Sequence, residues 1–243
     1  MKILLSPSKT RNIKSDNLIK KDFTIPLFIK EANYIADQIK EIDIGNLGRI
    51  MKIKKELLDS TFENYSNFEN LEELPAIHSY SGVVFNEIKL DIFNKEQVNY
   101  LASNLRILSA MYGVLRPFDG IKNYRLDMNA KVLDMTNYQF WKEKINEESI
   151  ELDVESKELV LNLSSEEFSK MLTFKYVKVD FKEKKEDDSY KIVGIYAKKA
   201  RGKMVNYLIL NRIETIDGVK KFIVDGYGYN EELSNDSNIV FTR

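Results

Sequence analysis

Apolar residues recur along the first half of the chain at spacings that predict one short strand followed by helices. Residues 2–5 are an apolar run typical of a short buried strand, closed by a Ser-Pro-Ser-Lys-Thr turn. Helical spacing of apolar side chains predicts helices over residues 27–41, 54–67 and 97–112. The last of these should end at Gly113, because glycine commonly follows a helix C-terminus.

The second half of the chain mixes the helical spacing of apolar residues with the alternation typical of strands. Residues 159–163 predict a strand, and Ser164 and Glu167 have capping-box spacing for a helix that follows it. A further helix is expected at residues 198–212. Alternating or β-branched runs predict strands at residues 174–182, 190–197, 222–224 and 239–241. This irregular mixture predicts an α+β (mixed α/β) fold, a single compact domain over residues 1–243 with a central sheet and surrounding helices.

Composition narrows the possible chemistry. Hydrophobic residues make up 43% of the chain and charged residues 31%, as in ordinary soluble globular proteins. The absence of cysteine excludes disulfides and thiolate chemistry, and a single histidine, His78, excludes sites built from several histidines. Only carboxylate-rich metal sites are then left open, and we expect no metal and no cofactor. No apolar run is long enough to span a membrane, so we expect a cytoplasmic protein without a membrane partner.

Charge is balanced overall but unevenly distributed. The chain has 37 basic and 38 acidic residues, for a net charge of −1, whereas proteins that coat nucleic acid are usually strongly basic. Residues 191–213 hold six basic and no acidic residues, and residues 44–55 hold four basic residues and no acidic one. An anion-binding site must therefore arise from local clusters, and the alternative is that these runs are solvated faces.

Several sequence blocks resemble the YaaA peroxide-stress family in order and spacing. They are residues 6–10 (SPSKT), 108–119 (LSAMYGVLRPFD), 124–128 (YRLDM), 140–141 (FW), 162–168 (NLSSEEF), 196–202 (YAKKARG), and the regions of Gly226-Tyr227 and Val240-Phe241. The resemblance implies a peroxide-stress protein that binds duplex and irregular DNA and is associated with repair and recombination. It also implies a single compact mixed α/β fold with a positively charged cleft and a helix-hairpin-helix element.

We map the helix-hairpin-helix element onto residues 47–62, with its hairpin at residues 51–54 and with Ile50 and Leu57 packing the two helices together. Backbone N–H groups at the start of the second helix would face phosphate oxygens. Three lysines would add positive charge there: Lys52, Lys54 and Lys55. The hairpin lacks the glycines that usually allow close approach of phosphate, so an ordinary helix pair with exposed lysines is the alternative.

Two further basic segments are candidate DNA contacts. One lies at the predicted start of a helix, where cations oppose the helix dipole and an anion would be favourable, and it consists of Lys198, Lys199, Arg201 and Lys203. Gly202 would let a backbone come close. The other consists of Arg116, Lys122 and Arg125, interleaved with Tyr112, Phe118 and Tyr124. Such aromatics can stack on bases, although they are more often core residues. Lys9 is expected to face the same cleft, in a pocket with Ser6, Arg116 and Lys198.

An enzyme acting on a nucleoside or a DNA base, such as an N-glycoside hydrolase, is the alternative to a DNA-binding protein. The candidate residues are Lys9 as nucleophile, Glu166 or Glu167 as acid/base and Asp127 as second carboxylate. Direct iron handling is disfavoured, because a di-iron bundle needs two Glu-x-x-His motifs and His78 is alone.

Overall fold

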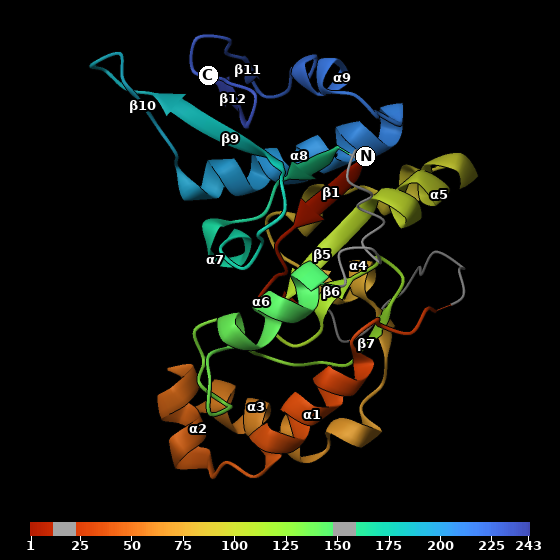
Figure 1. Ribbon diagram of the computed structural model, residues 1–243, viewed down its shortest axis with the longest axis vertical. Helices are drawn as coiled ribbons and strands as arrows, with labels where there is room; N and C mark the ends of the chain where they lie inside the picture. Colours follow the sequence, from red (N-terminus) through yellow and green to blue (C-terminus); the bar gives the residue numbers. More distant parts are fainter. Residues whose placement is uncertain (12–22, 148–158) are drawn as a thin grey trace.

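The computed structural model describes residues 1–11, 23–147 and 159–243 (Figure 1). At its centre lies an eight-stranded mixed sheet in which the strands run in the order β11, β12, β9, β8, β1, β5 and β6, with β10 paired to β9. Five of these strands are parallel: β12 (Asn238–Thr242), β9 (Val177–Lys184), β8 (Val160–Asn162), β1 (Lys2–Leu5) and β5 (Leu105–Ser109). Antiparallel partners complete it: β11 (Gly228–Tyr229), β6 (Gly113–Leu115) and β10 (Tyr190–Lys191).

Strand β1 is the middle of the sheet. Ile3 pairs with Leu105 of β5 on one side and with Leu161 of β8 on the other. Every residue of β1, β5 and β8 is buried, as expected for parallel strands covered on both faces. The strands expected at residues 2–5 and 159–163 are therefore confirmed.

Helices cover the sheet and extend the molecule at one end. Helix α8 (Gly194–Asn211) packs against β9 and against α5 (Lys95–Asn104). Figure 1 shows α1 (Ile29–Lys40), α2 (Ile44–Met51) and α3 (Glu56–Ser66) together at the end opposite β11 and β12. The other elements are shorter or flank these: η1 (Phe68–Asn70), β3 (Leu74–Pro75), α4 (Ala76–Ser79), β4 (Tyr80–Ser81), η2 (Phe85–Glu87), η3 (Leu90–Ile92), β7 (Gly120–Ile121), α6 (Asn137–Glu147), α7 (Glu166–Ser169) and α9 (Ile216–Lys220), with β2 (Thr10–Arg11) paired to β4.

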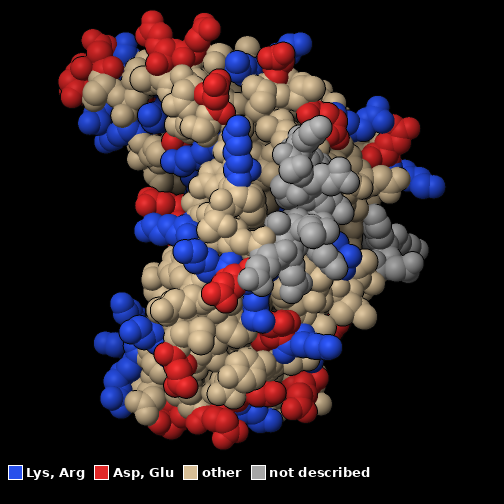
Figure 2. All heavy atoms as spheres, in the orientation of Figure 1, with Lys and Arg blue, Asp and Glu red and all other residues tan. Residues whose placement is uncertain are grey.

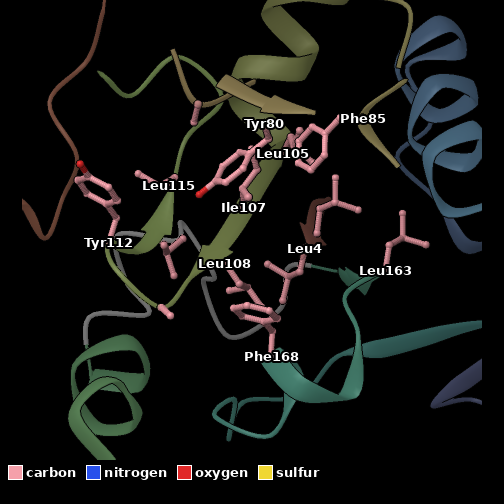
Figure 3. Packing of buried hydrophobic residues seen from close by; sticks show 14 of the residues in the cluster. Leu4, Tyr80, Phe85, Leu105, Ile107, Leu108, Tyr112, Leu115, Leu163 and Phe168 are labelled. Atoms are coloured by element: carbon pink, nitrogen blue, oxygen red, sulfur yellow. The ribbon is translucent and has the colours of Figure 1, made fainter. Parts of the chain in front are cut away.

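The hydrophobic core joins the sheet to these helices. Figure 3 shows the side chains of Leu4, Leu108 and Phe168, from β1, β5 and α7, pointing into the same interior. Trp141 is fully buried and donates its Nε1–H to the carbonyl of Ala110 at 2.8 Å. Gly113 has a positive φ of 68°, and a Cβ there would lie 2.7 Å from the Trp141 ring, so this turn requires glycine.

The helix predicted over residues 97–112 is wrong in its second half. Helix α5 ends at Asn104, and the chain continues directly as β5. The apolar spacing of Leu101, Leu105 and Leu108 fits a helix, but a strand buried on both faces is also apolar throughout. Pairing with β1, which is distant in sequence, decides in favour of the strand.

Three smaller predictions also need correction. The expected capping box is absent, because the Ser164 hydroxyl donates to Asn162 Oδ1 at 2.6 Å and the N-cap of α7 is Ser165. The strand expected at residues 190–197 stops at Lys191, since α8 already begins at Gly194. Residues 222–224 form no strand, and Val224 makes only an isolated bridge to Tyr227. Within the described part of the chain, no helix combines the length and apolarity needed to cross a membrane.

Candidate functional site

A cavity of about 590 Å³ lies where β1 and β8 end. Its lining comes from residues 5–11 after β1, from Leu163 and residues 165–168 after β8, from residues 82–85 and 124–127, and from two cations of α8, Lys198 and Arg201. Four of the blocks that carry the family resemblance contribute to this lining. The fold therefore joins segments that are far apart in sequence at one site.

The cavity occupies a topological switch point of the sheet. The chain leaving β1 next enters the sheet at β5, on one side of β1, whereas the chain leaving β8 enters it at β9, on the other side. The two connections diverge and leave a crevice between the carboxyl ends of β1 and β8. Open α/β sheets bind their ligands in such crevices.

Polar contacts tie the loop after β1 to its neighbours. Lys9 Nζ lies 2.8 Å from Asp127 Oδ1 and donates a hydrogen bond to Oδ2 at 2.9 Å. The Ser6 hydroxyl donates to Ser165 Oγ at 3.1 Å and accepts a hydrogen bond of 2.7 Å from the Ser165 N–H. These contacts fix the cavity wall and leave Lys9 paired with a carboxylate.

Arg11 is a cavity residue that the sequence analysis missed. Its guanidinium lies between the rings of Tyr80 and Tyr124, at 4.4 and 3.7 Å from their centroids. The Tyr124 hydroxyl shares hydrogen bonds with the Tyr80 hydroxyl at 2.7 Å and with Ser109 Oγ at 2.6 Å. Burial raises the pKa of Tyr80 well above its ordinary value, so the phenol stays neutral beside Arg11. The available signal was the position of Arg11 directly after the block at residues 6–10.

The basic run on α8 divides between two helix faces. Lys198 and Arg201, three residues apart, face the cavity. Lys203 instead donates two hydrogen bonds to Asp225, at 2.6 and 2.7 Å, and the charge of Lys199 also acts on Asp225. The prediction that these cations start the helix is wrong, because α8 begins at Gly194 and places them beyond its first turn. The helix dipole therefore does not explain them.

The close approach expected at Gly202 exists, but it involves the protein's own backbone. A Cβ at this position would lie 2.2 Å from the carbonyl oxygen of Val84, next to η2. Glycine thus allows α8 and the Val84 segment to pack closely beside the cavity.

The third basic segment is dispersed. Arg125 lines the cavity, whereas Arg116 is not among its lining residues and pairs with buried Asp119 at 3.0 Å. Lys122 donates to the carbonyl of Glu69 at 2.9 Å. Of the predicted pocket of Ser6, Lys9, Arg116 and Lys198, all but Arg116 line the cavity. The aromatics expected to stack on bases, Tyr112, Phe118 and Tyr124, are at most 5% exposed and belong to the core.

The turn between α2 and α3 carries Lys52, Lys54 and Lys55 on exposed positions, without an ion pair to any described residue. Lys52 and Lys55 have positive φ angles of 56° and 52°, conformations that glycine favours, although the turn contains no glycine. The predicted packing through Leu57 is wrong, since Leu57 is 44% exposed. Leu58 packs there instead, close against Gly48.

The cavity lining holds five cations and three carboxylates. The cations are Lys9, Arg11, Arg125, Lys198 and Arg201, and the carboxylates are Asp127, Glu166 and Glu167. Glu166 is exposed and lies 3.5 Å from Lys170 Nζ, an ion pair outside the lining. Burial lowers the pKa of His78, which is outside the lining as well. No cluster of three or more potential metal-ligating side chains occurs in the segments that the structure describes. The cavity is therefore suited to an anion.

Comparison with known proteins identifies the family of this chain. The family model described as peroxide stress protein YaaA matches residues 1–233. A UPF0246 protein of Fusobacterium nucleatum is 39% identical over 249 residues, covering 100% of this chain and 99% of the relative. UPF0246 proteins of Clostridium perfringens and Francisella philomiragia are 38% and 35% identical, with coverage of at least 98% of each chain. The chain therefore belongs to the family of the peroxide stress protein YaaA.

Proposed function

We propose that this protein binds DNA as part of the oxidative stress response. Membership of the peroxide stress protein YaaA family supports the stress role. The observation that carries the proposal is the convergence of Arg125, Lys198 and Arg201 on one cavity. Among the described residues, none of the three has an ion pair. Cations held together without carboxylate partners favour a polyanion, because phosphate contacts supply most of the affinity for DNA.

The turn between α2 and α3 supplies a second group of unpaired lysines. Figure 2 shows Lys and Arg side chains along one margin of the molecule, beside α7 and over α2, with an indentation between them. Two separated basic patches on one margin would contact separate phosphates of one DNA molecule. Local patches of this kind allow DNA binding in a chain whose net charge is −1.

Salt dependence tests the proposal. Fluorescence anisotropy with a labelled duplex should give an affinity that falls steeply between 50 and 200 mM salt. About six phosphate contacts correspond to a log–log slope of about −5. Lys198→Gln and Lys54→Gln should each reduce that slope by about 1. Arg212→Gln is the matched control, since Arg212 ends α8 away from the cavity and pairs with Glu96. Absence of binding, or a slope near zero, refutes DNA binding.

A second candidate function is hydrolysis of an N-glycosidic bond. The four residues considered for it all line the cavity, and Lys9 and Asp127 are in contact. They are Lys9, Asp127, Glu166 and Glu167. In this reaction water adds to the sugar carbon and the base leaves with a proton. Chromatography of nucleosides and damaged duplexes after incubation would reveal released base. Release that disappears in Lys9→Ala favours the enzyme, and its absence in the wild type excludes it for those substrates.

A further inference from the structure

Among the described residues that line the cavity, Arg201 is the one with a buried polar side-chain atom that lacks a partner. Its Nε is buried and has no hydrogen-bond partner. The rest of its guanidinium also makes no hydrogen bond or ion pair with any described residue. Burial lowers the pKa of Arg201, while the charge of Asp180 opposes this effect from a distance. A half-buried guanidinium has five N–H donors, and leaving them without acceptors costs free energy of folding. A bound ligand that supplies acceptor oxygens would remove this cost.

Neighbouring carboxylates do not fill this role. Asp180 is 4% exposed and lies 3.0 Å from Lys178 Nζ, at ion-pair distance though without hydrogen-bond geometry. Of the lining carboxylates, Asp127 pairs with Lys9 and Glu166 pairs with Lys170. Neither these two nor Glu167 forms an ion pair with Arg201. Arg201 is thus left for an external anion, and its planar fork suits a phosphate or a carboxylate.

Charge balance favours a phosphomonoester. Five cations and three carboxylates line the cavity, which leaves an excess of two positive charges. A phosphomonoester carries about −1.5 to −2 at neutral pH, whereas a phosphodiester of an internal nucleotide carries a single negative charge. Lys198, three residues before Arg201 on the same helix face, places a second cation beside the guanidinium.

Part of the remaining wall is apolar, and the cavity is larger than a phosphate. Its volume of about 590 Å³ falls in the range of small-molecule sites. Apolar side chains contribute much of the wall: Leu5, Val83, Val84, Phe85, Leu126 and Phe168. Inorganic phosphate would leave this wall in contact with water, whereas a base and a sugar would cover it.

We infer that this cavity binds one nucleoside phosphate that ends in a phosphomonoester, with its phosphate on Arg201 and Lys198 and its nucleoside against the wall at Val84 and Phe85. The ligand is either a free nucleoside monophosphate or the 5′-phosphorylated end of a DNA strand. In the second case the inference rests on the proposed function, and the cavity is where the DNA-binding protein holds a strand end.

Isothermal titration of the full-length protein with a nucleoside 5′-monophosphate, the matching nucleoside and inorganic phosphate tests the inference. We expect the monophosphate to bind at least tenfold more tightly than either fragment. Arg201→Gln and the exposed variant Lys198→Gln should each weaken its binding tenfold or more, while Arg212→Gln should leave it unchanged. No binding of the monophosphate, or equal binding by wild type and Lys198→Gln, would overturn the inference even if Arg201→Gln failed to fold.

Two duplexes that differ only in a 5′-phosphate identify the source of the ligand. Tighter binding of the phosphorylated duplex, lost in Lys198→Gln, indicates a strand end. Equal binding of the two duplexes together with binding of the monophosphate indicates a free nucleotide. The 5′-hydroxyl duplex also separates the two proposals. If this duplex binds in a salt-dependent manner but the monophosphate does not bind, the protein is a DNA-binding protein and the cavity inference is refuted. If the monophosphate binds but this duplex does not, the cavity inference holds and DNA binding is refuted.

Discussion

Replacing Gly202 by alanine tests how closely α8 approaches the segment before η2. The added Cβ would lie 2.2 Å from the carbonyl oxygen of Val84 and 2.8 Å from Glu87 Cβ. Real Cβ atoms essentially never approach a heavy atom within 3.0 Å, so the Val84 backbone would have to retreat by about 0.8 Å or more. Because the closest atom belongs to the backbone, a side-chain rotation cannot relieve this contact.

The size of the effect follows from two opposing terms. Inserting a methyl group into a packed interior costs about 1–3 kcal/mol, and the backbone contact places Gly202→Ala in the upper part of that range. Alanine regains about 1 kcal/mol of helix propensity relative to glycine. We therefore expect a net loss of about 2 kcal/mol in the free energy of unfolding. For a chain of this length, that loss corresponds to a melting temperature lower by about 4–8 °C.

Thermal unfolding followed by circular dichroism measures this change. Gly194→Ala is the matched control, since Gly194 lies in the same helix and an added Cβ there would meet nothing within 4 Å. The control should melt at or slightly above the wild-type temperature. Val84 also lines the cavity, so Gly202→Ala should weaken monophosphate binding as well. A Gly202→Ala protein that melts as high as Gly194→Ala would refute the close packing.

Three further substitutions probe local features. Lys55→Gly should raise the free energy of unfolding by about 1 kcal/mol in a denaturant titration, because a φ of 52° with ψ of −141° strains a lysine; unchanged stability would contradict that strain. Asn94→Ala should lower it by about 1 kcal/mol by removing the capping box of α5, whereas an unaltered midpoint would show the cap to be dispensable. The hydrogen bonds from Lys203 hold the pKa of Asp225 below its ordinary value. The ionised carboxylate therefore stabilises the folded protein above pH 3.8, and this stabilisation is lost as the pH falls through the depressed pKa. In Lys203→Gln, an NMR titration should find this pKa raised, and a constant value would show that Lys203 is not its cause.

Local patterns predicted the elements whose neighbours are close in sequence. Helix α1 follows from apolar side chains at helical spacing, and β1 follows from an uninterrupted apolar run. The failure at residues 97–112 has the opposite cause. Leu105 is compatible with a helix or with a strand, and only its pairing with Ile3, about a hundred residues earlier, selects the strand.

The cavity residues were likewise predicted only in part from the sequence. Sequence blocks identified Lys9, Arg125, Lys198 and Arg201 as candidates, and all four line the cavity. The sequence analysis grouped these cations with Arg116, although Arg116 pairs with Asp119, three residues further along the chain, and does not line the cavity. The faces of α8 were in principle predictable from its 3.6-residue period, but its start at Gly194 was not.

The sequence by itself determined the class of fold, the family and the absence of cysteine chemistry, because these depend on composition, periodicity and the order of blocks. Only the tertiary structure decided which lysine and arginine side chains have no carboxylate partner among the described residues. A lysine or arginine loses its availability when a carboxylate lies within ion-pair distance, as Asp225 does for Lys203. Pairs three residues apart, such as Arg116 and Asp119, can be expected from local spacing, but the distance between Lys203 and Asp225, 22 residues apart, depends on how the chain packs.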